Sequence, residues 1–432
     1  MTIRTLTAPS RLRGTIHVPG DKSISHRAIM FNAIAAGSAR ITNFLPGADC
    51  LSTITCVRAL GVEVQREATD VLITSPGLHA LREPGDLLDC GNSGTTLRLL
   101  TGLLAGRPGF AVLTGDASLR SRPQRRIVTP LRALGAQLDG RDDGDRAPLA
   151  VRGTRMHGGS YALPVASAQV KSALLLAALG GDAPLVLSGK IASRDHTERM
   201  LQAMGVELTV TPEQITLYPL TRLPAPLSLR VPGDPSSAAF WWVAAALHPD
   251  AELTTSGVCL NPTRTGALDV LRAMGADLTI THERVEGSEL IGDVTVRSSS
   301  LYGTEIAGAL IPRLIDEIPV LAVAAACAHG RTIIRDAQEL RAKETDRIAT
   351  VAAGLVDLGA TVEPTGDGLV IEGRGDLAFR GTALQSHGDH RLAMAWAVAS
   401  LVTRGTTTIG DPDCADVSYP NFWQTLDTIT QV

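Results

Sequence analysis

The chain repeats one eight-residue phrase five times at long and nearly regular intervals. Each copy ends a predicted amphipathic helix, places a glycine at a turn and continues into a predicted strand; the copies begin at Val57, Leu131, Leu201, Leu271 and Leu355. Their starts are 74, 70, 70 and 84 residues apart. A glycine just after a helix reaches positive φ without steric cost, so each copy predicts a helix-to-strand corner. Five such corners indicate a fold assembled from repeated units.

A second feature recurs between these corners. Small or polar residues open a mostly apolar helix, and glycine and a strand rich in Thr, Ile and Val follow it. These openings lie near Gly20, Gly91, Ser167, Gly233, Ile315 and Gly388. We therefore predict six similar units that combine helices with strands, an α/β fold.

One turn sequence marks two halves of the chain. Val-Pro-Gly-Asp occurs at 18–21 and again at 231–234, at a separation of 213 residues. We predict that these segments are crossovers between two domains, one of residues 21–232 and the other of residues 1–20 plus 233–432, with three units each. Two or three domains of ordinary size also fit a length of 432 residues.

Two helices are apolar on all sides, which constrains the layering. The segments Ala238–Leu247 and Val320–Ala328 carry almost no polar residue. A helix with no polar face must be buried, so we expect helices inside and sheets outside in each domain. A doubly wound α/β pair is the alternative that the sequence leaves open.

Composition excludes several classes of function. A net charge of −4 and an aromatic content of 3% argue against nucleic acid as a partner. The apolar runs are shorter than the roughly 20 residues that cross a bilayer, and the N-terminus has no signal-type apolar core, so we expect a cytoplasmic protein without a membrane span. The six cysteines form no Cys-x-x-Cys pair, which predicts reduced thiols and no metal site.

Lysine is rare among the basic residues. Of 40 Lys and Arg residues, only Lys22, Lys171, Lys190 and Lys343 are lysines. Coding bias explains most of this preference for arginine. A lysine that remains marks a place where a compact point charge is required, and it makes Lys22 and Lys343 candidate site residues.

Several helix openings carry the residues of an anion site, because helix N-termini present free N–H groups and partial positive charge. The segment 19–27 places Lys22, Ser23 and Arg27 at one helix start, with Ser23 and Arg27 four residues apart on one face. The segments 90–98 and 120–126 add a Gly-rich loop and four arginines. Each segment alone is also compatible with an ordinary helix cap or a solvated charge run.

Acidic residues accompany these cations. Asp316 and Glu317 stand at the mouth of an apolar helix, where a general base and simple helix-dipole pairing are equally good interpretations. The segment 341–348 predicts a helix that carries Lys343 and Arg347 on one face with Glu344 beside them. The segment 389–391 adds Asp, His and Arg at the sixth opening.

In this order, the motifs resemble the enolpyruvyl transferase family, and within it the 5-enolpyruvylshikimate-3-phosphate synthases. The matching segments are Pro19–Arg27, Gly91–Thr96, Ser121–Pro123, Ser167–Gln169, Ser193–Arg199, Asp316–Glu317, Arg341–Arg347 and Asp389–Arg391. The resemblance implies a two-domain inside-out α/β barrel of six βαβαββ units, three per domain. It implies transfer of the enolpyruvyl group of phosphoenolpyruvate to the 5-hydroxyl of shikimate 3-phosphate, with release of phosphate and without metal or organic cofactor.

The resemblance also implies a role for individual residues. The acid/base groups would be Lys22, Asp316 and Glu344. Shikimate 3-phosphate would be bound by Lys22, Ser23, Arg27, Ser167, Gln169, Arg194, Asp316 and Lys343. Phosphoenolpyruvate would be bound by Lys22, Gly94, Arg122, Gln169, Glu344, Arg347, His390 and Arg391. Because the family position of Gly94 is a glycine here, we expect inhibition by glyphosate, a competitor of phosphoenolpyruvate; we also expect a monomer.

Two departures and two rival functions complete the sequence interpretation. Ala168 replaces a serine of some members, and a lysine that others carry near the C-terminus is absent from the segment 414–420. One rival is transfer to UDP-N-acetylglucosamine; that sister enzyme typically has a cysteine in a loop that here, at 115–123, has none. The other rival is a non-catalytic anion-binding scaffold, against which the acids Asp316 and Glu344 argue.

Overall fold

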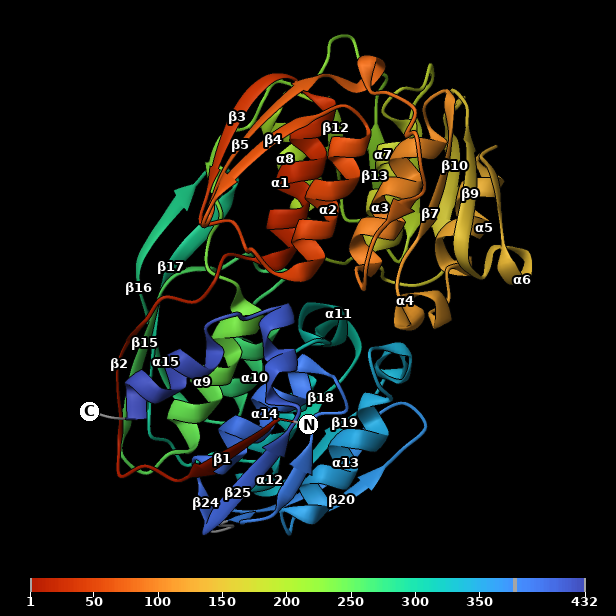
Figure 1. The fold of residues 1–432 in the computed structure, drawn as a ribbon. Coiled ribbons are helices and arrows are strands. Elements are labelled where there is room, and N and C mark those ends of the chain that lie inside the picture. The colour runs from red at the N-terminus through yellow and green to blue at the C-terminus, as the bar shows by residue number, and fades with distance from the viewer. Residues whose placement is uncertain (1, 376–378, 431–432) are drawn as a thin grey trace. The chain divides into compact units, whose positions relative to one another are not determined.

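The computed structural model describes residues 2–375 and 379–430. The first residue and the last two residues of the second predicted domain, together with 376–378, lie outside the described residues. The chain divides into two compact units (Figure 1), one of Gly20–Val231 with Glu286–Ser288, and one of Met1–Pro19, Pro232–Val285 and Glu289–Val432. The divisions after Pro19 and after Val231 fall within the two Val-Pro-Gly-Asp turns. We call these parts the 20–231 unit and the 232–432 unit.

The 20–231 unit contains three four-stranded sheets of one topology. Their strand orders are β14-β3-β5-β4, β6-β7-β9-β8 and β10-β11-β13-β12. In each sheet the first two strands pair in parallel and the other pairs are antiparallel. The strands are β3 (Ala36–Thr42), β4 (Glu63–Glu67), β5 (Asp70–Pro76), β6 (Leu88–Asp89), β7 (Gly109–Thr114), β8 (Gln137–Gly140), β9 (Arg146–Gly153), β10 (Gly159–Leu163), β11 (Leu185–Gly189), β12 (Leu208–Val210), β13 (Gln214–Leu217) and β14 (Leu229–Arg230).

The helices of this unit follow the same repeat. The first helix of each repeat begins at one of the predicted openings and is almost entirely buried: α1 (Lys22–Ile34), α3 (Gly94–Ala105) and α7 (Ala168–Ala178). The second helices are amphipathic or half-buried: α2 (Ala48–Ala59), α5 (Arg125–Ala133) and α8 (His196–Ala203). Two short helices, α4 (Ala117–Ser121) and α6 (Arg141–Gly144), interrupt the second repeat. The three repeats are therefore βαβαββ units.

The 232–432 unit repeats this plan with strands exchanged between the ends of the chain. Its sheets have the orders β16-β17-β15-β2, β18-β19-β21-β20 and β1-β25-β23, with a small pair β22-β24. The strands are β1 (Ile3–Thr7), β2 (Leu12–Ile16), β15 (Ala251–Cys259), β16 (Asp277–Glu286), β17 (Glu289–Arg297), β18 (Glu305–Ile306), β19 (His329–Ile334), β20 (Thr361–Pro364), β21 (Leu369–Arg374), β22 (Phe379–Arg380), β23 (Ala383–Gln385), β24 (Thr403–Arg404) and β25 (Thr406–Gly410). The N-terminal strands β1 and β2 thus complete two sheets whose other strands come from beyond Pro232.

The helices of the 232–432 unit form its interior. Its first helices, α9 (Pro235–Leu247), α12 (Ile318–Cys327) and α14 (His390–Ser400), pack against one another and are buried along nearly their whole length. Its other helices are α10 (Gly266–Ala273), α11 (Ile311–Leu314), α13 (Arg347–Asp357) and α15 (Phe422–Thr430). In Figure 1 the strands of each unit lie outside its own first helices, α1, α3 and α7 in one unit and α9, α12 and α14 in the other. The predicted inside-out arrangement is confirmed, and the doubly wound alternative is wrong.

The five predicted corners have the backbone that the sequence pattern requires. The glycines at 61, 135, 205, 275 and 359 have φ values of 90°, 94°, 80°, 89° and 94°. A side chain at these angles is strained, because its Cβ crowds the neighbouring carbonyl oxygen. The repeated glycine therefore ends each helix and directs the chain into the next strand.

Three further properties of the described residues bear on the site. The six cysteines are free thiols, four of them buried. Among residues 2–375 and 379–430, no group of three or more His, Cys, Asp or Glu side chains is arranged to hold a metal ion. No helix in this part of the chain is long and apolar enough to span a membrane.

Candidate active site

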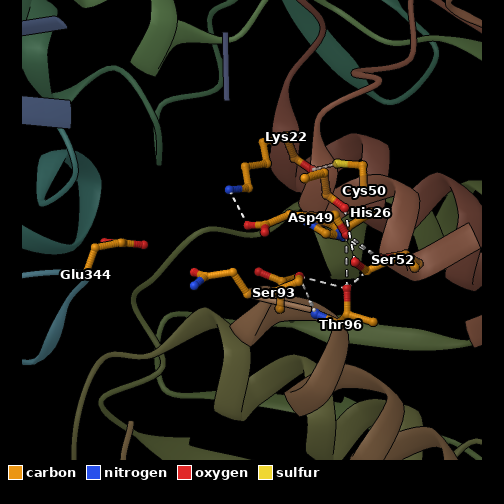
Figure 2. A network of polar contacts seen from close by, with 12 residues as sticks. Lys22, His26, Asp49, Cys50, Ser52, Ser93, Thr96 and Glu344 are labelled. Atoms are coloured by element: carbon orange, nitrogen blue, oxygen red, sulfur yellow. Dashed lines mark hydrogen bonds and ion pairs between the residues drawn. The ribbon is translucent and has the colours of Figure 1, made fainter. Parts of the chain in front are cut away.

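The start of α1 carries the lysine of the richest sequence motif. Asp21 caps the helix, because its Oδ1 accepts a hydrogen bond of 2.8 Å from the Ile24 backbone N–H. The next residue, Lys22, places its Nζ 2.5 Å from Oδ2 of Asp49 on α2, as Figure 2 shows. The Lys22 side chain is 20% exposed. This carboxylate orients the ammonium while leaving part of it accessible to a ligand.

Arg27, one turn further along α1, is buried and fixed by three neighbours. Its Nη1 donates to the Ser23 carbonyl at 3.0 Å, which confirms that these two residues share one helix face. Its Nε donates to Thr197 Oγ1 on α8 at 2.8 Å, and its Nη2 donates to Ser172 Oγ on α7 at 3.0 Å. Arg27 is only 3% exposed. Arg27 therefore links α1 to α7 and α8, the helices whose starts carry the predicted phosphate-binding residues Ser167 and Arg194.

A chain of polar contacts runs from the interior of α1 to the loop before α3 (Figure 2). His26 Nδ1 lies 2.7 Å from Thr53 Oγ1, which lies 2.7 Å from Thr96 Oγ1. Thr96 Oγ1 in turn donates to Ser93 Oγ at 2.7 Å, and Ser93 caps α3. Complete burial lowers the pKa of His26 from 6.5 to about 3, so the imidazole is neutral at physiological pH. This network fixes Ser93 and therefore the Gly-rich loop that leads into α3.

The Gly-rich loop is closely packed against an arginine. A Cβ on Gly94 would lie 2.6 Å from Nη1 of Arg98, which explains why this position has no side chain. Arg98 donates to Gln169 Oε1 at 2.8 Å and to Gln124 Oε1 at 3.0 Å. Gln169 Oε1 also accepts from Arg126 at 3.1 Å. The two arginines therefore fix which way the Gln169 amide faces.

The arginine-rich segment does not behave as a single charge run. Arg122 follows α4 and donates to Asn92 Oδ1 at 2.6 Å and to Ser118 Oγ at 3.2 Å, whereas Arg125 is exposed. Arg122 thus contacts Asn92 of the Gly-rich loop.

The third repeat supplies two more of the predicted residues. Ser167 caps α7 and accepts from the Val170 N–H at 3.5 Å, and Arg194 is half-buried two residues before α8. Both residues lie at helix starts in the same unit as Lys22 and Arg27.

The structure gives the two adjacent acids Asp316 and Glu317 different surroundings. Asp316 is 20% exposed, and its Oδ1 lies 3.1 Å from Lys343 Nζ and 3.7 Å from an Nη of Arg347. Glu317 is buried; its Oε1 accepts a short hydrogen bond from the Ser236 hydroxyl, and its Oε2 has no partner among the described residues. Asp316 is therefore the accessible acid of the pair, and Glu317 belongs to the packed interior.

Arg347 is the centre of the charged cluster in the 232–432 unit. Its Nη2 lies 2.6 Å from Glu344 Oε2, and its Nε and Nη2 donate to the two oxygens of Asp389 at 2.8 and 3.0 Å. Burial alone would lower the pKa of Arg347, but these carboxylates outweigh burial and raise it above its ordinary value. Burial alone would raise the pKa of Asp389, but the adjacent Arg347 lowers it. The buried pair therefore stays ionised.

One prediction for this cluster is wrong. Lys343 and Arg347 do not share a helix face, because the short 3₁₀ turn Gln338–Ala342 ends before Lys343, and α13 begins only at Arg347. Asp346 caps α13 by accepting from the Ala349 N–H at 3.2 Å, and this cap interrupts the predicted helix. Lys343 and Glu344 lie in the segment between the turn and the helix. Asp316 holds the Lys343 side chain, and Arg347 holds the Glu344 side chain.

The start of α14 carries the last two predicted residues. Asp389 caps the helix, accepting from the Arg391 N–H at 2.9 Å. The Arg391 guanidinium donates to the Ser236 carbonyl at 3.4 Å and lies over the Phe240 ring at 6.0 Å from its centroid. His390 and Arg391 are both largely buried. Asp389 thus caps the helix and orients Arg347 at the same time.

Sequence reasoning missed several residues that hold the predicted ones in place. Asp49 gave no signal, because it lies in an ordinary helix start. Asp389 stood within a recognised motif, and its position before two basic residues could have marked it as their counterion. Arg98 likewise ends the Gly-rich segment. Each of these residues positions another side chain: Asp49 positions Lys22, Arg98 positions Gln169, and Asp389 positions Arg347. Such a supporting role has no sequence pattern by which it could be recognised.

The fold and the site together define a class of protein. Each unit is an inside-out α/β barrel that presents cations at helix starts, and the 232–432 unit adds the partly accessible acids Asp316 and Glu344. Helix N-termini and such cations suit phosphate and carboxylate ligands, and accessible acids suit proton transfer. The chain is thus of the class of α/β enzymes that act on polyanionic substrates.

Comparison with known proteins gives the family. Residues 6–426 match the family model of EPSP synthase (3-phosphoshikimate 1-carboxyvinyltransferase). A protein of that activity from Chloroflexus aurantiacus is 72% identical over 431 residues, 99% of each chain. One from Gloeobacter violaceus is 54% identical over 428 residues, 99% of this chain and 98% of the other. The EPSP synthase structure from Acinetobacter baumannii has a TM-score of 0.88 at 41% identity and covers 99% of this chain and 98% of that one. The chain belongs to the EPSP synthase family.

Proposed function

We propose that this chain transfers the enolpyruvyl group of phosphoenolpyruvate to the 5-hydroxyl of shikimate 3-phosphate, a step of aromatic amino acid biosynthesis. The observation that carries the proposal is the cluster around Arg347, in which Asp316 and Glu344 are partly accessible acids held by cations. The side chains of Lys343 and Arg347 hold these carboxylates in place. A carboxylate held in this way can accept a proton from a substrate and return it.

The reaction adds and then eliminates. The 5-hydroxyl oxygen bonds to C2 of phosphoenolpyruvate while the hydroxyl loses its proton and C3 gains one, giving a tetrahedral adduct. Elimination then removes the C3 proton and breaks the bond from C2 to the phosphate oxygen, so that phosphate leaves with its electron pair. These transfers require acid/base groups for the hydroxyl and for C3. We assign them to Lys22, Asp316 and Glu344.

Shikimate 3-phosphate would be bound mainly by residues of the 20–231 unit. Arg27 supports this assignment because it is hydrogen-bonded to Ser172 on α7 and to Thr197 on α8. Ser167 and Arg194 lie at the starts of these same two helices. The proposed ligands are Lys22, Ser23, Arg27, Ser167, Gln169, Arg194, Asp316 and Lys343. Charge-assisted hydrogen bonds to a phosphate contribute about 1.5–3 kcal/mol each, so several are needed to replace its hydration.

The resemblance implies a separate set of residues for phosphoenolpyruvate, and we propose them as its ligands. They are Lys22, Gly94, Arg122, Gln169, Glu344, Arg347, His390 and Arg391. Supporting this choice, Gly94 and Arg122 lie at one loop, and Arg347, His390 and Arg391 lie around the Asp389 cap. The absent C-terminal lysine of other members leaves one contact of this set unassigned.

The residues also favour this reaction over its rivals. The loop 115–123 has no cysteine, which argues against transfer to UDP-N-acetylglucosamine. A non-catalytic scaffold would gain nothing from the accessible acids, since a carboxylate near an anionic ligand weakens its binding. We further propose that glyphosate competes with phosphoenolpyruvate, that the enzyme acts as a monomer, and that it is cytoplasmic.

Phosphate release tests the proposal directly. The purified enzyme is incubated with phosphoenolpyruvate and either shikimate 3-phosphate or UDP-N-acetylglucosamine, and phosphate is measured over time. Release with shikimate 3-phosphate alone is the expected result. Release only with the nucleotide sugar would establish the sister reaction, and release with neither, despite binding of both anions, would establish the scaffold.

A further inference from the structure

Lys171 is a lysine to which the proposed function gives no role. Its side chain is 1% exposed, whereas the side chains of Lys22 and Lys343 are 20% and 26% exposed. It lies on α7, and its Nζ is 2.6 Å from Oε1 of Glu198 on α8, whose side chain is 3% exposed. A buried ion pair has a large desolvation cost, so its presence calls for an explanation.

The Lys171 ammonium is matched by three acceptors. Besides Glu198, it donates to the backbone carbonyls of Ile191 and Ser193, each at 3.3 Å. An ammonium has three N–H donors in a compact group, so all of them are used. A guanidinium is larger and presents its donors in one plane, whereas the ammonium is a compact charge with three donors. The three contacts therefore favour a lysine at this position in a chain with only four lysines.

The pair lies beside the proposed shikimate 3-phosphate ligands. Ser193 directly precedes Arg194, so the two carbonyl contacts fix the backbone that leads into that residue. Ser172 follows Lys171 and Thr197 precedes Glu198; these two hydroxyls are hydrogen-bonded to each other at 2.6 Å, and both accept from Arg27. The Lys171–Glu198 ion pair therefore supports the residues that position two arginines of the proposed phosphate site, Arg194 and Arg27.

Glu198 depends on this contact. Its second oxygen, Oε2, is buried and has no hydrogen-bond partner in the described part of the chain. Removal of the Lys171 ammonium would therefore leave the Glu198 carboxylate without this cation and would take one donor from each of two carbonyls; the Ile191 carbonyl would keep only the longer contact, of 3.4 Å, from the Ser193 hydroxyl. The loop 191–195 and the start of α8 would then move to bring these groups into contact with water.

We infer that Lys171 is a positioning residue for shikimate 3-phosphate, which acts with Glu198 by fixing the segment 191–197 so that Arg194 and Arg27 meet the phosphate together. The inference rests on the proposed function of this site. It predicts a loss confined to one substrate, because Lys171 stands behind the shikimate 3-phosphate ligands and not behind the Gly-rich loop.

The test compares Lys171→Met and Lys171→Arg with the wild-type enzyme. Calorimetry measures the affinity for shikimate 3-phosphate, and steady-state kinetics gives KM for each substrate and kcat. We expect the affinity for shikimate 3-phosphate to fall about tenfold to 100-fold in both variants, with a much smaller change in KM for phosphoenolpyruvate. Lys190→Met is the matched control: it removes an exposed lysine next to the same loop, and it should bind shikimate 3-phosphate like the wild type.

A double variant separates positioning from stability. Lys171→Met with Glu198→Leu removes both buried charges, so it should recover much of the melting temperature lost in Lys171→Met. Its affinity for shikimate 3-phosphate should stay low, because the carbonyls of Ile191 and Ser193 still lack the Lys171 ammonium. If Lys171→Met does not fold, the double variant supplies the same measurement.

Wild-type affinity for shikimate 3-phosphate in Lys171→Met or in the double variant would overturn the inference. Equal losses for both substrates would also overturn it, since they would indicate general damage to the fold. Failure of the proposed function is distinct, because the wild-type enzyme itself would then neither bind shikimate 3-phosphate nor release phosphate.

Discussion

Asp316 and Glu317 are adjacent in the chain, yet their carboxylates have entirely different surroundings. Oδ1 of Asp316 lies 3.1 Å from Lys343 Nζ, and the Asp316 side chain is partly exposed. Glu317 is buried, and its carboxylate accepts a hydrogen bond from the Ser236 hydroxyl. The peptide between them turns the first carboxylate towards the charged cluster and the second into the packed start of α12. Their roles should separate in the same way.

We expect Asp316→Asn to lower kcat by about 100-fold to 10,000-fold, because an amide cannot accept the proton of the 5-hydroxyl. Glu317→Gln is the matched neighbour. It should keep most of kcat but lower the free energy of unfolding by about 1–3 kcal/mol, because a buried amide N–H₂ would replace the unpaired Oε2. Phosphate-release kinetics and urea unfolding of both variants measure this contrast; a larger loss of kcat in Glu317→Gln would reverse the assignment.

Glu344 should matter for turnover more than for binding. Its Oε2 lies 2.6 Å from Nη2 of Arg347, which orients the carboxylate. Glu344→Gln preserves the shape of the side chain but removes its capacity to exchange a proton. We expect kcat to fall by about 100-fold or more, with a much smaller change in affinity for shikimate 3-phosphate. Calorimetry and steady-state rates decide this, with the exposed Glu363→Gln as control; an unchanged kcat would remove Glu344 from proton transfer.

Gly94→Ala tests the phosphoenolpyruvate side of the site. The added Cβ would lie 2.6 Å from Nη1 of Arg98, and Arg98 cannot yield freely, because it is held by Gln124 and Gln169. We expect a higher KM for phosphoenolpyruvate and a larger rise in the inhibition constant of glyphosate. Gly85→Ala is the control, since a Cβ there meets no atom within 4 Å.

Two outcomes would contradict this account of Gly94. Unchanged values of KM and of the inhibition constant would show that the loop accepts the methyl group. Wild-type enzyme with normal phosphoenolpyruvate affinity but no inhibition by glyphosate would refute the proposed sensitivity itself.

The features that the sequence predicted are those decided within a few residues. A corner such as Gly61 needs only the glycine and its helix, and the starts of α1 and α14 need only their caps. The six units and their inside-out layering follow from such signals repeated along the chain. The motif residues could be placed at helix starts for the same reason, because their neighbours in sequence are also their neighbours in space.

The features that the sequence did not predict depend on partners far along the chain. Lys22 is paired with Asp49 on another helix, and Arg98 is held by Gln169 from the next repeat. Which of many carboxylates or amides meets a given cation is decided by packing, which leaves no local pattern. The predicted helix through Lys343 failed for a related reason: the cap by Asp346 competes with helix continuation and ends it.

Burial of His26 should make stability depend on pH. Burial lowers the pKa of His26 from 6.5 to about 3, so the folded protein holds this imidazole neutral. Below about pH 6.5 the unfolded chain binds a proton here that the folded chain does not, and stability is lost as the pH falls towards the folded pKa. The slope from this one group reaches about 1.4 kcal/mol per pH unit.

We therefore expect His26→Asn to lose less stability than the wild type when the pH is lowered from about 7 to about 5. Other titrating groups contribute equally to both proteins, so the difference between the two curves isolates His26. Urea unfolding at several pH values measures it, and the exposed His79→Asn should follow the wild-type curve. Parallel curves for His26→Asn and wild type would mean that the imidazole can bind a proton in the folded state, and that its contact with Thr53 does not require the neutral form.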